Sequence, residues 1–261
     1  MVCSSYALEV TPSDISADIP TKTSADVAEV VLLNKAIISY AHDELTEGFD
    51  PWDQYSVSLG RKFSFGSVIA RVNQARRFNT NGTQVEVDAY PRIRDGTYLY
   101  LNAGRSSDSI FPSQRYGFEI FQNLGNAWEA SLGNRYLEFD QSIVRIYTGT
   151  VGKYIGNYYY LFRANFVPDE AGDSYSGRMQ IRRYYGNENY VSISASAGDS
   201  PTLVTAGNIA VLKSSGGSLD LYHSLTATVF GSLGLSYSKD EIRAGTYRGD
   251  WTYSGSIEKR F

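Results

Sequence analysis

Most of the chain consists of short segments in which apolar and polar residues alternate. In "GTQVEVDAYPRI", Val85 and Val87 fall on one face, and Glu86 and Asp88 fall on the other. "RMQIRR" and "SIVRIYTGTVGKY" repeat the pattern. A period of two is the period of a β-strand. Because no stretch reads as a long amphipathic helix, we expect an all-β fold of antiparallel strands.

Turn residues separate these segments at regular intervals, as in "NTNG" (79–82), "RDG" (94–96), "NLGN" (123–126), "IGN" (155–157) and "GNEN" (186–189). Glycine and asparagine tolerate the positive φ angles that tight turns need. We count about fourteen strands; twelve or sixteen also fit, because 199–230 is hard to divide. The expected strands begin near Ala36, Gln54, Ser67, Thr83, Thr97, Arg115, Trp128, Ile143, Tyr158, Tyr175, Tyr190, Ala210, Gly231 and Thr252.

Alternation fits a soluble sandwich as well as a membrane barrel, and three features favour the barrel. Small residues recur on the polar face, as in a crowded lumen: Gly60, Gly104, Gly117, Gly133 and Gly149. Aromatic residues lie at strand ends, as at membrane interfaces: Tyr55, Tyr98, Tyr116, Trp128, Tyr136, Tyr154, Tyr158, Tyr175, Tyr190 and Tyr253. The last strand ends in Phe261. A terminal aromatic residue is typical of outer-membrane barrels, whose assembly machinery is therefore an expected partner.

Composition excludes several classes of protein. No apolar run approaches the roughly 18 residues of a transmembrane helix. The formal net charge of −4 gives no basic patch for nucleic acid. The single cysteine excludes an intrachain disulfide and a cysteine-based metal site. We expect no metal and no cofactor, since no group of carboxylates has the spacing of a dedicated site.

Several segments together resemble one known family. "GSVIARVNQARRF", "GTYLYLNAG", "RYGFEIFQNL", "EASLGNRYLEF" and "IYTGTVGKYIGNYYY" are similar to the YaiO-type outer-membrane β-barrel family, over roughly 35–261. The resemblance implies the outer membrane of a Gram-negative bacterium, surrounded by its lipid and lipopolysaccharide. Some relatives are thought to accompany envelope polysaccharide systems. We therefore expect a transmembrane up-and-down barrel at 35–261, preceded at 1–34 by a leader that is periplasmic or plugs the lumen.

If both chain ends lie in the periplasm, the longer connections at 106–114, 168–173, 198–208 and 244–250 should lie outside. This register predicts a basic strip along one wall of the lumen: Arg135, Arg145, Arg163, Arg178 and Arg182. The opposite wall should hold Arg71, Glu86, Asp88 and Glu119. Such a lumen would pass or hold a polar solute, with the basic strip meeting anionic groups. Alternatively, the charges pair only to fill a closed lumen.

The stretch "NYYYLFRANF" (157–166) makes the register explicit. Tyr158, Tyr160 and Phe162 should face lipid, whereas Tyr159 and Arg163 should face the lumen. A shift of one residue would put Arg163 in hydrocarbon, at a cost of roughly 2–4 kcal/mol near the midplane.

Two other functions stay open. An outer-membrane enzyme acting on lipid or glycan would use a Ser/His/acid group, and the chain has two histidines, His42 and His223. Neither neighbour pair, His42–Asp43 or His223–Ser224, can act alone, because adjacent strand residues face opposite ways. We therefore expect no enzyme activity. A barrel with a filled lumen and a structural or docking role is the remaining alternative.

Overall fold

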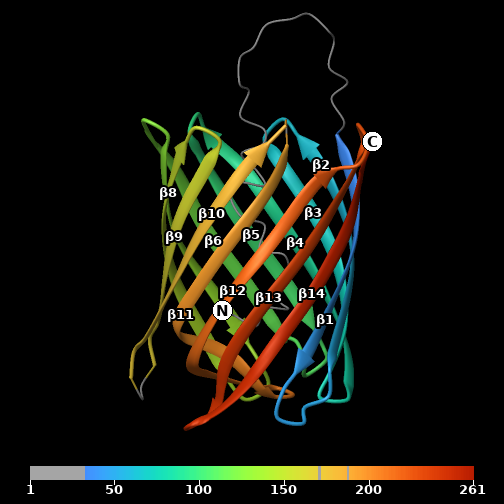
Figure 1. The fold of residues 1–261 in the computed structure, drawn as a ribbon, viewed down its shortest axis with the longest axis vertical. Helices are drawn as coiled ribbons and strands as arrows, with labels where there is room; N and C mark the ends of the chain where they lie inside the picture. The colour runs from blue at the N-terminus through green and yellow to red at the C-terminus, as the bar shows by residue number, and fades with distance from the viewer. Residues whose placement is uncertain (1–32, 170–171, 187) are drawn as a thin grey trace, which may run out of the picture.

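The computed structural model describes residues 33–169, 172–186 and 188–261, which form one closed antiparallel barrel (Figure 1). Each strand pairs with its neighbours in the sequence, and β1 (Asn34–Leu45) pairs with β14 (Thr246–Arg260) to close the ring. The other strands are β2 (Trp52–Phe63), β3 (Gly66–Arg77), β4 (Thr80–Arg94), β5 (Thr97–Ser106), β6 (Gln114–Gly125), β7 (Trp128–Glu138), β8 (Ile143–Ile155), β9 (Tyr158–Val167), β10 (Ser174–Tyr185), β11 (Asn189–Thr205), β12 (Asn208–Ser224) and β13 (Val229–Arg243). In this part of the chain, no helix is long and apolar enough to cross a membrane.

The predicted all-β barrel and its fourteen strands are confirmed. Thirteen strands begin within three residues of the expected positions, whereas β14 begins at Thr246 rather than near Thr252. The expected outer loops at 198–208 and 244–250 are wrong, because β11 and β12 run on to a tight turn at 206–207, and β13 and β14 to one at 244–245. The leader predicted for 1–34 lies almost entirely outside the described residues.

The two ends of the barrel differ. Asn34 and Phe261 lie together, each backbone N–H donating to the other residue's carbonyl at 2.9 Å. We call this the terminal end, at the top of Figure 1; it carries the short predicted turns between β4 and β5, β6 and β7, and β8 and β9. The opposite end, the loop end, carries the longer connections 46–51, 107–113 and 168–173. In bacterial barrels, short turns face the periplasm and longer loops face outside.

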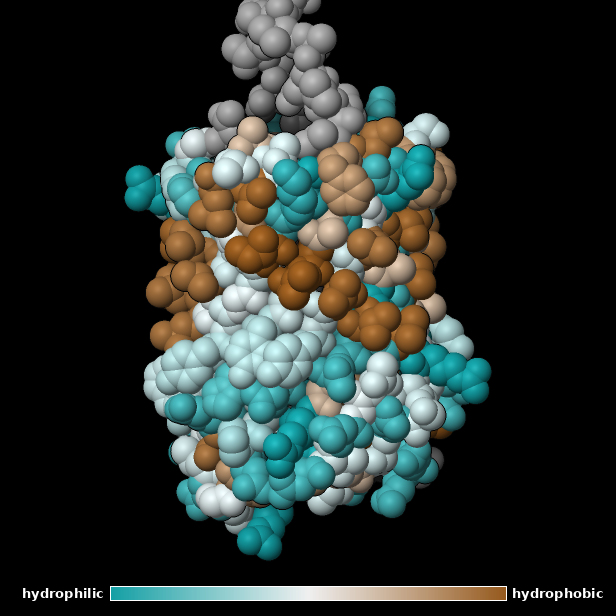
Figure 2. All heavy atoms as spheres, turned by 90° about the vertical axis from the view of Figure 1, so that its right-hand side faces the viewer, coloured by the Kyte–Doolittle hydropathy of each residue, from teal (hydrophilic) through white to brown (hydrophobic). Residues whose placement is uncertain are grey.

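The outer surface carries an apolar belt. Leu59, Leu132, Ile193 and Leu233 point outward and are more than half exposed. On the side seen in Figure 2, apolar residues gather in the half nearer the terminal end, and polar residues cover the half toward the loop end. The fold therefore presents a lipid-compatible face and projects beyond it at the loop end.

Strand β9 has the predicted register. Tyr158, Tyr160 and Phe162 are exposed on the outer face, whereas Tyr159 and Arg163 are buried on the inner face. The arginine within the aromatic stretch is therefore an inward residue between outward rings.

The register predicts that an outward and an inward position on one strand differ in how much stability an introduced charge costs. We expect Leu233→Arg, in the apolar belt, to lower the free energy of unfolding in lipid vesicles by about 2–4 kcal/mol. Ser236→Arg, on the inner face of the same strand, should cost less than half as much. Equal losses at the two positions, measured by denaturant unfolding in vesicles, would contradict the register.

Candidate functional site: the barrel lumen

Eight of the nine residues predicted to line the lumen point inward. These eight residues lie at inward positions of their strands: Arg71, Glu86, Asp88, Glu119, Arg135, Arg163, Arg178 and Arg182. Because successive strand residues alternate between lumen and lipid, each strand contributes its charges at every second position.

Strands β3 to β6 hold a cluster of paired charges. Glu86 lies between two guanidinium groups, with Arg71 Nη1 at 3.3 Å and Arg115 Nη1 at 2.6 Å. Asp88 accepts from Asn102 at 2.7 Å and from Tyr100 at 3.0 Å, and lies 3.3 Å from Arg71 Nη2. Two carboxylates are thus matched by two arginines on the same wall. Buried charges are tolerated when paired and hydrogen-bonded in this way.

Glu119 does not lie opposite the basic strip, as the sequence suggested, but joins it. One of its oxygens lies 3.3 Å from Arg163 Nη2, and Ser131 Oγ donates to the same oxygen at 2.5 Å. A Cβ on Gly133 would lie only 2.8 Å from the Glu119 side chain. The inward Gly133 therefore leaves the space that the Glu119 side chain occupies. This close approach explains why a glycine lies at this position of the polar face.

The remaining wall is lined by small hydroxyl groups, which sequence reasoning missed. The hydroxyl oxygens of Ser194 on β11 and Ser218 on β12 lie 2.9 Å apart, and those of Ser232 on β13 and Ser256 on β14 lie 2.7 Å apart. Similar pairs continue along this hydroxyl wall: Ser39–Ser56, Ser192–Asp220, Ser214–Asp240 and Ser238–Asp240. Alternate serines in "SISASAG" and "GSLGLSYS" carried the signal.

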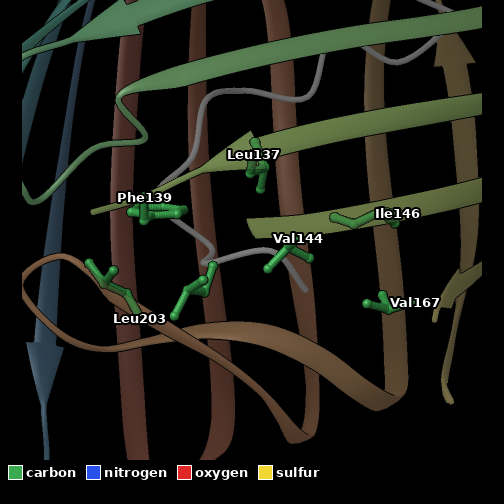
Figure 3. Packing of buried hydrophobic residues seen from close by; sticks show 7 residues of the cluster. Leu137, Phe139, Val144, Ile146, Val167 and Leu203 are labelled. Atoms are coloured by element: carbon green, nitrogen blue, oxygen red, sulfur yellow. The ribbon is translucent and has the colours of Figure 1, made fainter. Parts of the chain in front are cut away.

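Toward the loop end, the β11–β12 hairpin packs against the inner wall. Leu203 and Ile209, on either side of its turn, are buried against Leu137, Val144 and Ile146 of β7 and β8 (Figure 3). The tip also bonds neighbouring loops: the N–H of Gly207 donates to the Ser109 carbonyl at 2.8 Å. Gly207 adopts φ 77°, which favours glycine at the turn. The hairpin therefore bridges from its own wall to the β5–β6 and β7–β8 connections.

The predicted lumen position of Arg145 is wrong. Arg145 and Tyr147 are exposed on the outer face, and Val144 and Ile146 face inward. The apolar side of this segment was assigned to lipid, but it forms the internal surface on which Leu203 and Ile209 dock. Gly149 lies on the same face of β8 as Arg145 and therefore also points outward, not into the lumen as predicted. Arg145 instead places its guanidinium 5.8 Å from the Tyr136 ring on the outer surface.

The two histidines lie on the outer surface, away from the lumen. His42 Nδ1 is 2.9 Å from Asp53 Oδ1, which also accepts from Tyr40 at 2.7 Å. His223 Nδ1 lies 3.3 Å from the Tyr185 hydroxyl. Among the residues that the structure describes, no serine or threonine hydroxyl bonds to either ring, and no group of three His, Cys, Asp or Glu side chains could hold a metal ion.

Comparisons with known proteins agree with this architecture. Residues 33–203 match the family model of the YaiO membrane beta barrel domain. No curated protein matches the sequence. Among solved structures, the outer membrane protein Omp33 of Acinetobacter baumannii has a TM-score of 0.53 at 12% identity, with 88% of this chain and 99% of that chain covered.

Two further solved structures share the fold. A bacterial polysaccharide outer membrane secretin has a TM-score of 0.55 at 9% identity, covering 89% of this chain and 100% of that chain. The CymD monoaromatic hydrocarbon channel has a TM-score of 0.57 at 8% identity, covering 87% and 88% respectively. At these identities, the similarity shows the fold.

The contact between Glu119 and Arg163 predicts an energetic coupling. We expect Glu119→Gln and Arg163→Gln, combined in a double-mutant cycle, to show a coupling energy of about 1–3 kcal/mol in unfolding experiments. The control is the pair Glu119→Gln and Arg71→Gln, which do not contact and should be additive within about 0.5 kcal/mol. Additivity of Glu119 with Arg163 would contradict the pairing.

Proposed function

Since the chain belongs to the YaiO membrane β-barrel family and lies in the bacterial outer membrane, we propose that its lumen is a porin-like passage for a polar solute that carries anionic groups. One observation carries the proposal: the inner face is polar on both walls, with buried charges on both and rows of hydroxyl groups from β11 to β2. Polar groups along both walls can exchange hydrogen bonds with a polar solute over the length of the lumen.

The charges favour an anionic solute. On β6 to β10, four inward arginines, Arg135, Arg163, Arg178 and Arg182, accompany two carboxylates, Glu119 and Glu129. On β3 to β6, by contrast, Arg71 and Arg115 are matched by Glu86 and Asp88. Rings or strips of one charge set the selectivity of pores. The excess of guanidinium groups therefore lies on one wall, and the hydroxyl wall holds aspartates such as Asp220 and Asp240 among its serines.

The β11–β12 hairpin acts as the gate of this passage. Leu203 and Ile209 hold it against the inner wall near the loop end. Burying two aliphatic side chains stabilises the docked position by about 3–6 kcal/mol. This energy is small enough for the hairpin to undock when a solute or a partner binds the released position more tightly.

Envelope polysaccharide is one solute that would use both walls. Its hydroxyl groups can donate to and accept from serines, which do both. Its acidic groups can accept from guanidinium groups. Delivery of the chain to the membrane by the barrel assembly machinery through the Phe261 strand stays a prediction.

Ion conduction tests the passage and its selectivity together. In planar bilayers, we expect the purified protein to conduct, with reversal potentials in a salt gradient that show anion preference. Arg178→Gln with Arg182→Gln should move the reversal potential toward zero, and Arg145→Gln, which removes an outward charge, should leave it unchanged. Conductance equal to that of a blank bilayer, under all gating conditions, would leave the filled structural barrel as the function.

Weakening the hairpin contacts tests the gate. We expect Leu203→Ser with Ile209→Ser to raise the mean conductance roughly threefold or more, because the hairpin loses most of its apolar contact. Leu225→Ser, an exposed leucine in a turn at the terminal end, is the matched control. An unchanged or lower conductance in the double variant would contradict the gate.

A further inference from the structure

The terminal end of the lumen carries a row of inward aromatic rings. The sequence suggested that Tyr98, Tyr154 and Tyr190 belong to the lipid-facing girdle, but all three point inward. They join other inward rings, and we call the set the aromatic collar: Tyr90, Tyr98, Tyr100, Phe121, Tyr154, Tyr159, Tyr184, Tyr190, Tyr222 and Phe230. Every member lies within a few residues of the strand end that faces the terminal end.

The rings follow the circumference of the barrel from strand to strand. Tyr184 and Tyr190 have centroids 6.0 Å apart, and Tyr190 and Tyr222 are stacked at 5.3 Å. Tyr222 in turn stacks on Phe230 at 5.5 Å. Four adjacent strands, β10 to β13, thus each contribute one ring to a continuous row. Tyr184, Tyr190 and Tyr222 are half-buried, so part of each side chain remains accessible.

The collar continues on β5 to β9, where two tyrosines share one carboxylate. Tyr98 stacks on Phe121 at 4.7 Å, and Tyr154 packs on Tyr159 at 4.4 Å. Glu129 of β7 accepts from Tyr98 at 3.2 Å and from Tyr159 at 3.4 Å. The hydroxyls of Tyr98 and Tyr159 are therefore held by one carboxylate, and their rings are fixed beside the mouth.

Cationic groups accompany the rings. The Arg182 guanidinium lies 3.9 Å from the Tyr190 centroid, and that of Arg260 lies 3.9 Å from the Phe230 centroid. Arg260 also donates to the Tyr222 hydroxyl at 3.0 Å and pairs with Glu188 at 2.7 Å. The mouth thus combines flat apolar surfaces with guanidinium groups, a pairing that contact with lipid does not explain, because all of these groups face the lumen.

We propose that the half-buried rings of the aromatic collar, among them Tyr184, Tyr190 and Tyr222, bind an acidic glycan chain where it enters the lumen from the terminal end, and that the buried rings support them. The C–H face of a sugar ring is apolar and packs on an aromatic face, whereas its edge carries hydroxyl groups. Carboxylate groups on the sugar meet the arginines beside the rings. The hydroxyl wall continues from the collar along β11 to β14 and offers hydrogen bonds to the next units.

The inference rests on the proposed function, because it names the solute of the same passage. A row of rings suits a repeating chain: each sugar unit leaving one ring meets another, so the chain can advance without losing all contact at once. Simple filling of the mouth would explain the burial of the rings but would not give them affinity for sugars.

Equilibrium binding tests the collar without requiring passage. Isothermal titration of the detergent-purified barrel should show saturable binding of tetramannuronate, and weaker binding of the neutral tetrasaccharide cellotetraose. We expect Tyr184→Leu and Tyr222→Leu each to raise the Kd for tetramannuronate by about fivefold or more. The Tyr222→Phe variant should keep most of the affinity of the native protein, since it retains the ring and loses only the hydroxyl. Tyr175→Leu, on the outer face, is the matched control and should bind like the native protein.

The outcomes separate the two proposals. Loss of affinity in the two leucine variants with unchanged ion conductance supports the collar within a working passage. Conduction without saturable tetramannuronate binding, or equal Kd values in all variants, overturns the collar and leaves the passage. Binding that depends on the rings in a barrel that never conducts overturns the passage and supports the collar as a glycan-docking site.

Discussion

The structure depends on one constraint, which is that a backbone in lipid must satisfy all of its hydrogen bonds within the protein. The chain meets it by pairing every strand with two neighbours and by joining β1 to β14, where Asn34 and Phe261 exchange backbone hydrogen bonds at the end of the seam. Closure of the barrel gives the sheet an outer face toward lipid and an inner face toward the lumen. Because a strand is pleated, successive residues point alternately to these two faces. Because lipid excludes charge from the outer face along the apolar belt, arginines and carboxylates at that level are directed into the lumen, whereas Arg145, nearer the loop end of β8, faces outward.

The lumen must then accommodate these groups at acceptable cost. On one wall, long charged side chains pair, and glycines such as Gly133 leave space for them. On the other wall, serines keep the interior polar while occupying little volume. Near the loop end, the interior becomes apolar where Leu203 and Ile209 pack on β7 and β8, and at the terminal end it becomes aromatic. These successive zones of different chemistry along one axis are the features on which the proposed passage depends.

The period of two, together with the turn residues and the aromatic strand ends, was sufficient to predict a barrel of about fourteen strands. It also predicted the inward position of Arg163, because one face of β9 is clearly apolar and aromatic. It could not assign faces where both surroundings are apolar. Val144 and Ile146 have the pattern of lipid-facing residues, yet they contact a hairpin that is distant in the sequence. Tyr98 and Tyr190 carry the same ambiguity, since a tyrosine near a strand end suits either a membrane interface or the mouth of a lumen. Only the three-dimensional register separates these cases. The hydroxyl wall was missed because its alternate serines carry no charge that would mark an inward face.

The central claim, an apolar exterior around a polar interior, is tested most directly along 158–165. Single cysteines at these positions, in a chain with Cys3 replaced by serine, can carry a fluorophore in vesicles that contain a lipid-attached quencher. The account predicts strong quenching at 158, 160, 162 and 164, and weak quenching at 159, 161, 163 and 165. Uniform quenching, or strong quenching at 163, would contradict it, because Arg163 would then face lipid rather than Glu119.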